Sequence, residues 1–515
     1  MPRQFNTAGP CQPDIHYMLA PAARVPGVRA MVEGRHYFVL HAQRQVGKTT
    51  ALLALARELT SEGQFAAVTV SCETGTPFED LERAIPAMLG AWRGRANAFL
   101  PPELRPPPWP VSEPAAAIRD ALEAWSLACP RPLVVFLDEV DGLAPEVLGS
   151  VLRQLRDGHV NRPEGFPWSL GLIGLRDLKD YVVTSGGTGR SGAGSPFNIS
   201  AGSLTMQSFT RDEVGELYAQ HTAETGQVFA EGVVDRAWDL TRGQPWLVNA
   251  LAREATTVLV PDRTEAVTVA HINDAKETLV RRRDTHLQSL ASRLREDRVR
   301  RIIQPLMAGE PLPAVSEDDL AYVMELGLIR LGEGQVLQIA NPMYSDAFPR
   351  ALANTIEVSL PAATHPWLDS AGRLDLDRLL AGFLAFWRQH GEPLMGASPY
   401  HEIAPHLVLM AWLHRVCNGG GSLDREFAAG TGRMDLNLRY GDVRLGIELK
   451  VWRDGRRDPL AEGITQIDAY LSRIGVATGW LVVFDRRTGQ PPIEERTTAE
   501  AITTPAGHAV TVVRG

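Results

Sequence analysis

Only four of the 52 lysine and arginine residues in this 515-residue chain are lysines, and two of the four lie in patterns that can do chemistry. Lys48 lies in the segment QVGKTT, and Lys450 lies in IELKVW. A lysine kept where arginine is otherwise used indicates a site that needs a compact ammonium group, because guanidinium is planar and stays protonated. The two lysines therefore mark two candidate sites, one in each half of the chain.

The segment around Lys48 has the residue pattern of a phosphate-binding loop. An apolar strand is expected at 36–42 and a helix at 51–59, so the loop lies between a strand and a helix. Backbone N–H groups of such a loop cradle phosphate, the lysine reaches the β- and γ-phosphates, and the Thr49 hydroxyl binds Mg²⁺. Ala42 stands where the pattern G-x-x-x-x-G-K-[ST] has its first glycine. The expected nucleotide-binding residues of this segment are Gly47, Lys48, Thr49 and Thr50.

An acidic pair follows a second apolar segment. Residues 133–141, LVVFLDEVD, form a continuous apolar run that ends in acids, as in a buried parallel strand that delivers them to its carboxyl edge. Asp138 is expected to bind Mg²⁺, and Glu139 to polarise an attacking water. A third apolar segment, 169–175, ends at Arg176, a candidate γ-phosphate sensor. The alternative interpretation is a buried strand followed by a solvated acidic loop.

Residues 1–290 together resemble the P-loop ATPases of the AAA+/STAND group. The resemblance implies a parallel sheet that binds and hydrolyses ATP with Mg²⁺, followed by a helical lid. In the lid, Gly243-Gln244-Pro245 is similar to the G-x-P signature of STAND proteins, whose proline, here Pro245, approaches the nucleotide. A helix that begins with proline at its first position explains the same tripeptide without a nucleotide. An arginine finger acting in trans would imply a homo-oligomer, which stays open.

The segment around Lys450 predicts an αβββαβ order of elements between residues 400 and 485. Asp435 lies on the second expected strand, and Glu448 lies on the third, two residues before the lysine. Residues two apart on a strand point to the same face. Carboxylates from adjacent strands can hold Mg²⁺, and a lysine beside the metal can contact the attacking water and neutralise a phosphodiester. The alternative is a solvated Glu-x-Lys pair on an edge strand.

This arrangement resembles the PD-(D/E)XK nuclease superfamily over residues 385–515. The resemblance implies a restriction-endonuclease-like domain that binds Mg²⁺ through Asp435 and Glu448 and cleaves nucleic acid, DNA more than RNA. Gln466 in TQIDAY is similar to the glutamine that supports the lysine from the following helix. Glu402, near the start of the first helix, could complete the acidic cluster. The candidate catalytic residues of the whole chain are Glu139, Glu402, Asp435, Glu448, Lys450 and Gln466.

Composition narrows the class of protein. The net charge of −9 gives no global basic surface, so any contact with nucleic acid must come from local patches. Four cysteines without C-x-x-C pairing fit a reducing compartment. The first residues lack the apolar core of a signal peptide, and no run of about 18 apolar residues occurs. We therefore expect a cytoplasmic protein with no membrane partner.

The chain is expected to be an α/β protein of five parts. These are a P-loop ATPase core (1–205), a helical lid (206–290), a winged-helix-like module (291–357), a linker with a leading helix (358–384) and a nuclease-like domain (385–515). The winged-helix-like module is expected from a helix followed by a hairpin, and such modules bind DNA in some proteins and pack against the ATPase in others.

The expected function is a nuclease controlled by ATP, and proteins that combine such modules resemble prokaryotic defence or mobile-element effectors. One alternative is an ATP-dependent switch that does not cleave, in which the nuclease-like domain only binds nucleic acid or a partner. Another is a transcription regulator that uses the winged helix, with the ATPase as its sensor.

Overall fold

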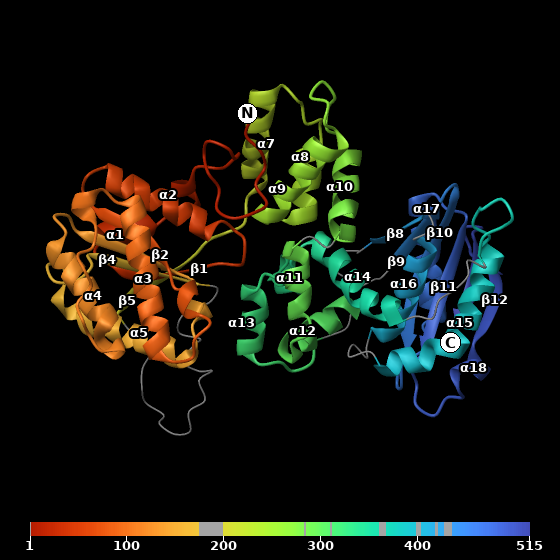
Figure 1. The fold of residues 1–515 in the computed structure, drawn as a ribbon. Helices are drawn as coiled ribbons and strands as arrows, with labels where there is room; N and C mark the ends of the chain where they lie inside the picture. Colours follow the sequence, from red (N-terminus) through yellow and green to blue (C-terminus); the bar gives the residue numbers. More distant parts are fainter. Residues whose placement is uncertain are drawn as a thin grey trace. The chain divides into compact units, whose positions relative to one another are not determined.

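The computed structural model contains two compact units (Figure 1), described separately below. Unit 1 holds residues 1–279 with 324–327, and unit 2 holds residues 280–323 with 328–515. The structure describes residues 2–174, 199–282, 285–308, 312–359, 367–397, 403–417, 421–426 and 435–515.

A five-stranded parallel sheet forms the centre of unit 1, with the strand order β2-β3-β4-β1-β5. All six residues of β3 and of β4 are buried, as continuous apolar runs predict for a sheet covered on both faces. The predicted strands at 36–42, 133–141 and 169–175 are confirmed as β1, β3 and β4. The strands are β1 (Tyr37–His41), β2 (Ala66–Ser71), β3 (Leu133–Asp138), β4 (Ser169–Gly174) and β5 (Ser200–Thr205).

Helices cover both faces of this sheet (Figure 1), because alternate residues of each strand point to opposite sides. Tyr37 and Val39 of β1 pack with Trp92 and other residues of α3, α4 and α5. Phe38 and Leu40 pack instead with α1 and α2. The helices are α1 (Val28–Glu33), α2 (Lys48–Ser61), α3 (Leu81–Phe99), α4 (Pro114–Ala128) and α5 (Pro145–Gly158).

Helices α7 to α10 follow the sheet, where helices were predicted, and we call residues 206–290 the lid. α7 begins with a capping box, in which the Thr210 side chain and the Glu213 side chain each accept from the other residue's backbone N–H. Pro245 is the first residue of α9, where its fixed φ suits a helix start. The helices are α7 (Arg211–Thr225), α8 (Val233–Thr241), α9 (Pro245–Glu254) and α10 (Val269–Arg282).

Unit 2 begins with helices and a small hairpin. The predicted helix followed by a hairpin is present as α13 and the antiparallel pair β6 and β7. Pro342 begins the 18-residue helix α14, which packs against α16. The elements are α11 (Thr285–Arg293), α12 (Asp297–Ala308), α13 (Glu317–Glu325), β6 (Ile329–Leu331), β7 (Leu337–Ile339) and α14 (Pro342–Ser359).

The rest of unit 2 is a six-stranded mixed sheet with the order β12-β13-β11-β10-β9-β8. β8, β9 and β10 are antiparallel, and α17 connects β10 to its parallel neighbour β11. The predicted αβββαβ order is therefore found from α16 to β11. The elements are α15 (Leu376–Ala397), α16 (Ala404–Cys417), β8 (Gly421–Glu426), β9 (Asp435–Tyr440), β10 (Val443–Trp452), α17 (Leu460–Ile474) and β11 (Thr478–Asp485).

The sheet continues beyond the predicted αβββαβ order. A short helix and a hairpin follow, α18 (Ile493–Arg496), β12 (Thr498–Thr503) and β13 (Ala509–Arg514). β12 is exposed at five of its six positions, which explains why its sequence lacks the alternation of a half-buried strand. Helices pack on both faces of this sheet at β11. Leu481 and Val483 of β11 pack against α17 on one face. Trp480 and Phe484 of β11 contact Phe383 and Trp387 of α15 on the other face.

Within the described ranges, none of the helices combines the length and the apolar character needed to cross a bilayer.

Gly243, between α8 and α9, offers a test of this packing. Its φ is +74°, and a Cβ there would lie 1.8 Å from the Phe209 carbonyl oxygen. We expect Gly243→Ala to lower the free energy of unfolding by about 3 kcal/mol or more, since strain and a backbone clash add. Gly63→Ala is the matched control, because Gly63 has φ +86° but open space around it. Its expected loss is about 1 kcal/mol. Equal losses in denaturant unfolding would contradict the clash.

Candidate functional site

The loop between β1 and α2 has the backbone of a phosphate cradle. Gly47 precedes α2 with φ +97°, and no side chain caps the helix N-terminus. The first N–H groups of α2 are therefore available to an anion. Lys48 Nζ donates to the carbonyl oxygens of Ala42 (2.6 Å) and Gln43 (2.9 Å), so the ammonium group lies over the loop. Ala42 is not among the residues with positive φ, which explains why a Cβ is tolerated where the pattern has glycine.

The two predicted Mg²⁺ ligands of unit 1 meet directly. Thr49 Oγ1 donates to Asp138 Oδ2 at 2.7 Å, although the two residues are 89 positions apart. Asp138 Oδ1 accepts from the backbone N–H of Glu139 at 3.0 Å. Burial raises the pKa of Asp138, while the Thr49 hydrogen bond and the Lys48 charge oppose that rise. A hydroxyl and a carboxylate at this position suit a hard cation such as Mg²⁺.

Glu139 follows the last residue of β3 with a left-handed backbone, φ 59°. Burial raises the pKa of Glu139, and the negative charges of Glu73, Asp138 and Asp141 raise it further. A carboxyl group with a raised pKa is better suited to accept a proton near neutral pH. The predicted role of Glu139 as a general base therefore stays a prediction with a suitable electrostatic setting.

The lid contacts the phosphate loop through a residue that the sequence prediction did not single out. Gln244 is 4% exposed, and its Oε1 accepts from Leu247 N–H at 2.7 Å, which caps α9. Its Nε2 donates to the Arg44 carbonyl oxygen at 3.5 Å. Pro245 holds the first position of the same helix. The tripeptide thus joins lid and loop through its glutamine.

The N-terminal segment also reaches this region. The Cys11 N–H donates to Thr50 Oγ1 at 3.0 Å, so Thr50 holds the N-terminal segment against the first turn of α2. Trp246 Nε1 donates to the Thr7 carbonyl oxygen at 2.8 Å, which ties the same segment to the lid. Two predicted site residues, Arg176 and Glu402, lie outside the described residues.

A second cluster of charged groups lies on β10 of unit 2. Glu448 is 1% exposed, and its Oε1 lies 3.2 Å from Lys450 Nζ. The backbone of Asp435 on β9 pairs in register with Glu448, as predicted for adjacent strands. The structure therefore brings Glu448 and Lys450 together and places the Asp435 position directly opposite.

α17 adds two residues to this cluster. Glu462 Oε1 accepts from Gln466 Nε2 at 2.5 Å and lies 3.5 Å from Lys450 Nζ. Gln466 is 7% exposed, and its Oε1 has no hydrogen-bond partner among the described residues. The sequence prediction missed Glu462, because an acid on a largely exposed helix position is normally solvated. The available signal was its place one helical turn before Gln466.

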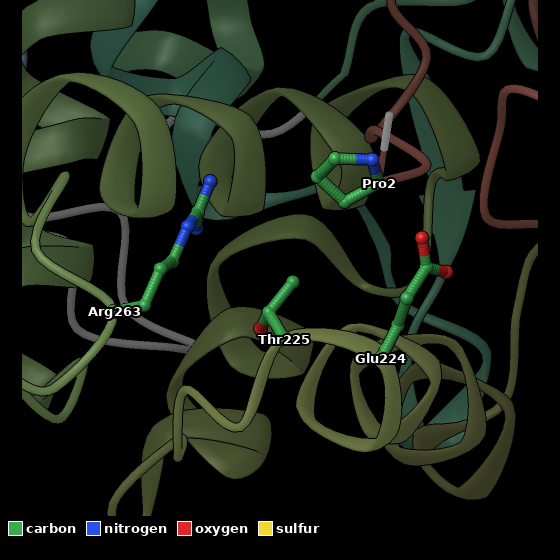
Figure 2. A pocket seen from close by; sticks show the side chains of 4 residues that line it. All are labelled: Pro2, Glu224, Thr225 and Arg263. Atoms are coloured by element: carbon green, nitrogen blue, oxygen red, sulfur yellow. The ribbon is translucent and has the colours of Figure 1, made fainter.

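No group of three or more His, Cys, Asp or Glu side chains within the described ranges has the geometry of a metal site. An open cavity of about 450 Å³ lies in the lid (Figure 2), where Glu224 and Arg263 approach from different segments. Glu224 accepts from Arg3, and Arg263 donates to Gln227 at 2.7 Å, so both charged groups are already engaged. The cavity is lined by Pro2, Glu224, Thr225 and Arg263, none of which belongs to the phosphate loop.

Comparison with known proteins gives similarity to solved structures only. No protein-family model matches the chain, and no curated protein matches it. The Walker-type ATPase PABY2304 of Pyrococcus abyssi is 14% identical, with a TM-score of 0.46, 67% of this chain covered and 99% of that one. The RuvB Holliday junction branch migration motor of Thermotoga maritima is 14% identical, with a TM-score of 0.33 and coverage of 61% and 88%. Cdc6p of Pyrobaculum aerophilum is 13% identical, with a TM-score of 0.34 and coverage of 65% and 96%.

These values are too low for the similarity to assign an activity. The five-stranded parallel sheet and the loop between β1 and α2 are consistent with a P-loop NTPase domain.

The pKa of Lys48 generates a test of the phosphate loop. Burial lowers the pKa of Lys48 to about 8, against the attraction of Asp138 and Asp141. Below pH 8 the ammonium is charged and triphosphate affinity is expected to be level. Above pH 8 binding must first restore the proton, so affinity falls by up to about tenfold per pH unit. Fluorescence titration with a labelled triphosphate between pH 6.5 and 9.5 measures this.

Lys48→Arg is the matched control, because arginine stays charged over the whole range. Its affinity is expected to be weaker at neutral pH and to lack the fall above pH 8. The same fall in both proteins would show that another group titrates.

Proposed function

We propose that this protein is a nuclease controlled by ATP, in which an N-terminal P-loop ATPase regulates a C-terminal Mg²⁺-dependent endonuclease that cuts nucleic acid, DNA in the first place. The observation that carries the nuclease is the cluster on β10. A carboxylate that is 1% exposed lies 3.2 Å from a lysine, opposite the backbone of a second acid. Burying a carboxylate costs several kcal/mol unless it is paired, so such a cluster on one strand favours a chemical role.

Each residue of the cluster has a task that phosphodiester cleavage needs. Asp435 and Glu448 would hold Mg²⁺, which supplies a more acidic water and neutralises phosphate charge when bound. The Lys450 ammonium then stabilises the negative charge that develops on the phosphate oxygens. Gln466 holds Glu462 beside Lys450 and keeps a buried carbonyl oxygen on the same side of the sheet. The superfamily resemblance of residues 385–515 supports the same roles.

The ATPase half would supply the control. Lys48 would contact the β- and γ-phosphates, Thr49 and Asp138 would hold Mg²⁺, and Glu139 would orient the attacking water. Gln244 links the lid to the loop through the Arg44 carbonyl oxygen, so the occupancy of the loop can bias the position of the lid. Nuclease activity under nucleotide control suits a prokaryotic defence or mobile-element effector, and we place the protein in that class.

Plasmid cleavage tests the proposal directly. We expect the purified protein to cut plasmid DNA with Mg²⁺ and not with EDTA, in a manner that depends on ATP. Lys450→Ala should lower the rate about a hundredfold or more, because it removes a charge aimed at the transition state. Lys48→Ala should leave the nuclease cluster intact but remove the dependence on ATP. Gel electrophoresis of supercoiled, nicked and linear forms follows both effects.

Lys276→Ala is a matched control, since Lys276 pairs with Glu277 on its own helix at 2.8 Å. It should behave as the wild type. If no nucleic acid is cut under any nucleotide condition, the nuclease proposal fails and a non-cleaving switch remains. If Lys48→Ala responds to ATP as the wild type does, the control by ATP fails while the nuclease survives.

Glu462 allows a graded test. Its side chain is 66% exposed, and its distance to Lys450 Nζ is 3.5 Å, so water screens the interaction. Exposed ion pairs contribute about 0–1 kcal/mol, and Glu462→Gln should therefore slow cleavage no more than about fivefold. Gln466→Ala, which empties a buried position, should slow it more. A loss with Glu462→Gln equal to that of Lys450→Ala, measured as initial rates, would show that Glu462 acts in the chemistry itself.

A further inference from the structure

Arginines gather at one edge of the unit 2 sheet. β10, β11 and β13 are parallel, so their carboxyl ends meet at the same edge. β10 ends at Trp452 and is followed by RDGRRD, and β11 ends at Asp485 and is followed by two further arginines. The two loops lie side by side, since Trp452 pairs in register with Asp485. We call residues 452–458 and 485–487 the arginine edge.

Trp452 gives this edge a fixed frame. The Arg487 guanidinium lies 3.4 Å from the centre of the Trp452 ring, and Trp452 Nε1 donates to the Arg456 carbonyl oxygen at 3.0 Å. Arg487 also pairs with Asp485 at 2.6 Å, and Arg514 pairs with Asp458 at 2.8 Å. Cation–π stacking together with a paired carboxylate holds these side chains in place. The charges of Arg487 and Arg514 are therefore neutralised by Asp485 and Asp458.

Two other arginines of the edge form no ion pair within the described residues. Arg456 and Arg457 are exposed, and neither side chain has a hydrogen-bond or ion-pair partner in the part of the chain that the structure describes. The Arg486 N–H donates to the Trp452 carbonyl oxygen at 2.7 Å, so Arg486 and Arg453 directly follow two paired strand ends. Burial lowers the pKa of Arg486, and the positive charge of Arg453 lowers it further. Concentrated positive charge beside a rigid frame favours an anion.

The edge adjoins the cluster around Glu448 and Lys450. Residues 448, 450 and 452 alternate along β10, so they face the same side of the sheet. Trp452 lies two residues beyond Lys450, which is about 7 Å along the strand. A chain of phosphates held with one phosphate at Lys450 would bring its neighbours within reach of the arginines.

We propose that the arginine edge binds the phosphodiester backbone of the nucleic acid that is cut beside Lys450, without reading its base sequence. Guanidinium groups match phosphate oxygens in a two-point geometry, and contacts to phosphates position a nucleic acid without specifying bases. This inference rests on the proposed nuclease function, and it assigns to the loops after β10 and β11 the task of orienting the substrate.

Binding without cleavage tests the inference. Fluorescence anisotropy with the full chain in EDTA measures affinity for labelled single-stranded DNA, double-stranded DNA and RNA of two unrelated sequences each. Arg456→Ala and Arg457→Ala should each weaken binding of all sequences alike, and the double variant should lose more. The slope of log Kd against log salt should fall by about 1 for each single variant and about 2 for the double variant. Arg456→Lys with Arg457→Lys should retain most of the slope.

Arg444→Ala is the matched control. Arg444 is an exposed arginine near the amino end of the same strand, at the opposite edge of the sheet. It should leave affinity and slope unchanged. The inference is overturned if Arg444→Ala weakens binding as much as the edge variants do, or if the double variant binds like the wild type. The nuclease proposal still stands in that case if the wild type cleaves plasmid DNA. If the edge variants weaken salt-dependent binding but the wild type cleaves nothing with Mg²⁺, the edge binds nucleic acid and the nuclease proposal fails. Displacement by polyglutamate at equal charge would point to an acidic protein and overturn the inference.

Discussion

In each unit, a buried carboxylate lies near a lysine, and polar groups close to it compensate its charge. Asp138 is 5% exposed and Glu448 is 1% exposed. A charge removed from water destabilises the fold by several kcal/mol unless fixed partners compensate it. Thr49 at 2.7 Å provides one such partner, and Lys450 at 3.2 Å provides another.

Parallel strands explain how the partners meet. In unit 1, β4 lies between β1 and β3, so the carboxyl ends of β1 and β3 are about 10 Å apart. The first turn of α2 spans this gap, and it does so because the side chains of α2 pack against the same face as Phe38 and Leu40. In unit 2, α17 connects β10 to β11 and brings Glu462 to 3.5 Å from Lys450 Nζ, where Gln466 donates to Glu462. The apolar packing of α2 and α17 thus fixes the polar geometry.

Elements with strong local patterns could be predicted from the sequence, and long-range pairings could not. The buried run of β3, the Thr210 capping box and the helix that carries Gln466 each leave a local signal. The pairing of β1 with β5 leaves none, because the partners are about 160 residues apart and β5, with the sequence SAGSLT, has no continuous apolar run. The role of Gln244 was missed for a related reason. Glutamine is not among the residues favoured at a helix N-cap, so its bond to Leu247 was not expected. Its second bond, to Arg44, depends on where the lid folds.

The lysines and arginines of this chain lie in settings that match the different shapes of their charged groups. The Lys48 ammonium is held by two carbonyl oxygens within 2.9 Å, and Lys450 lies between two carboxylates. Both settings place oxygen acceptors on more than one side of the ammonium group, which suits a compact donor better than a planar guanidinium. Arg487, by contrast, stacks on an aromatic face, which only a planar group does well. Lys276 pairs with the next residue of its own helix, so scarcity alone does not define a site. What distinguishes Lys48 and Lys450 is a buried carboxylate close by, together with bonds that join separate segments of the chain.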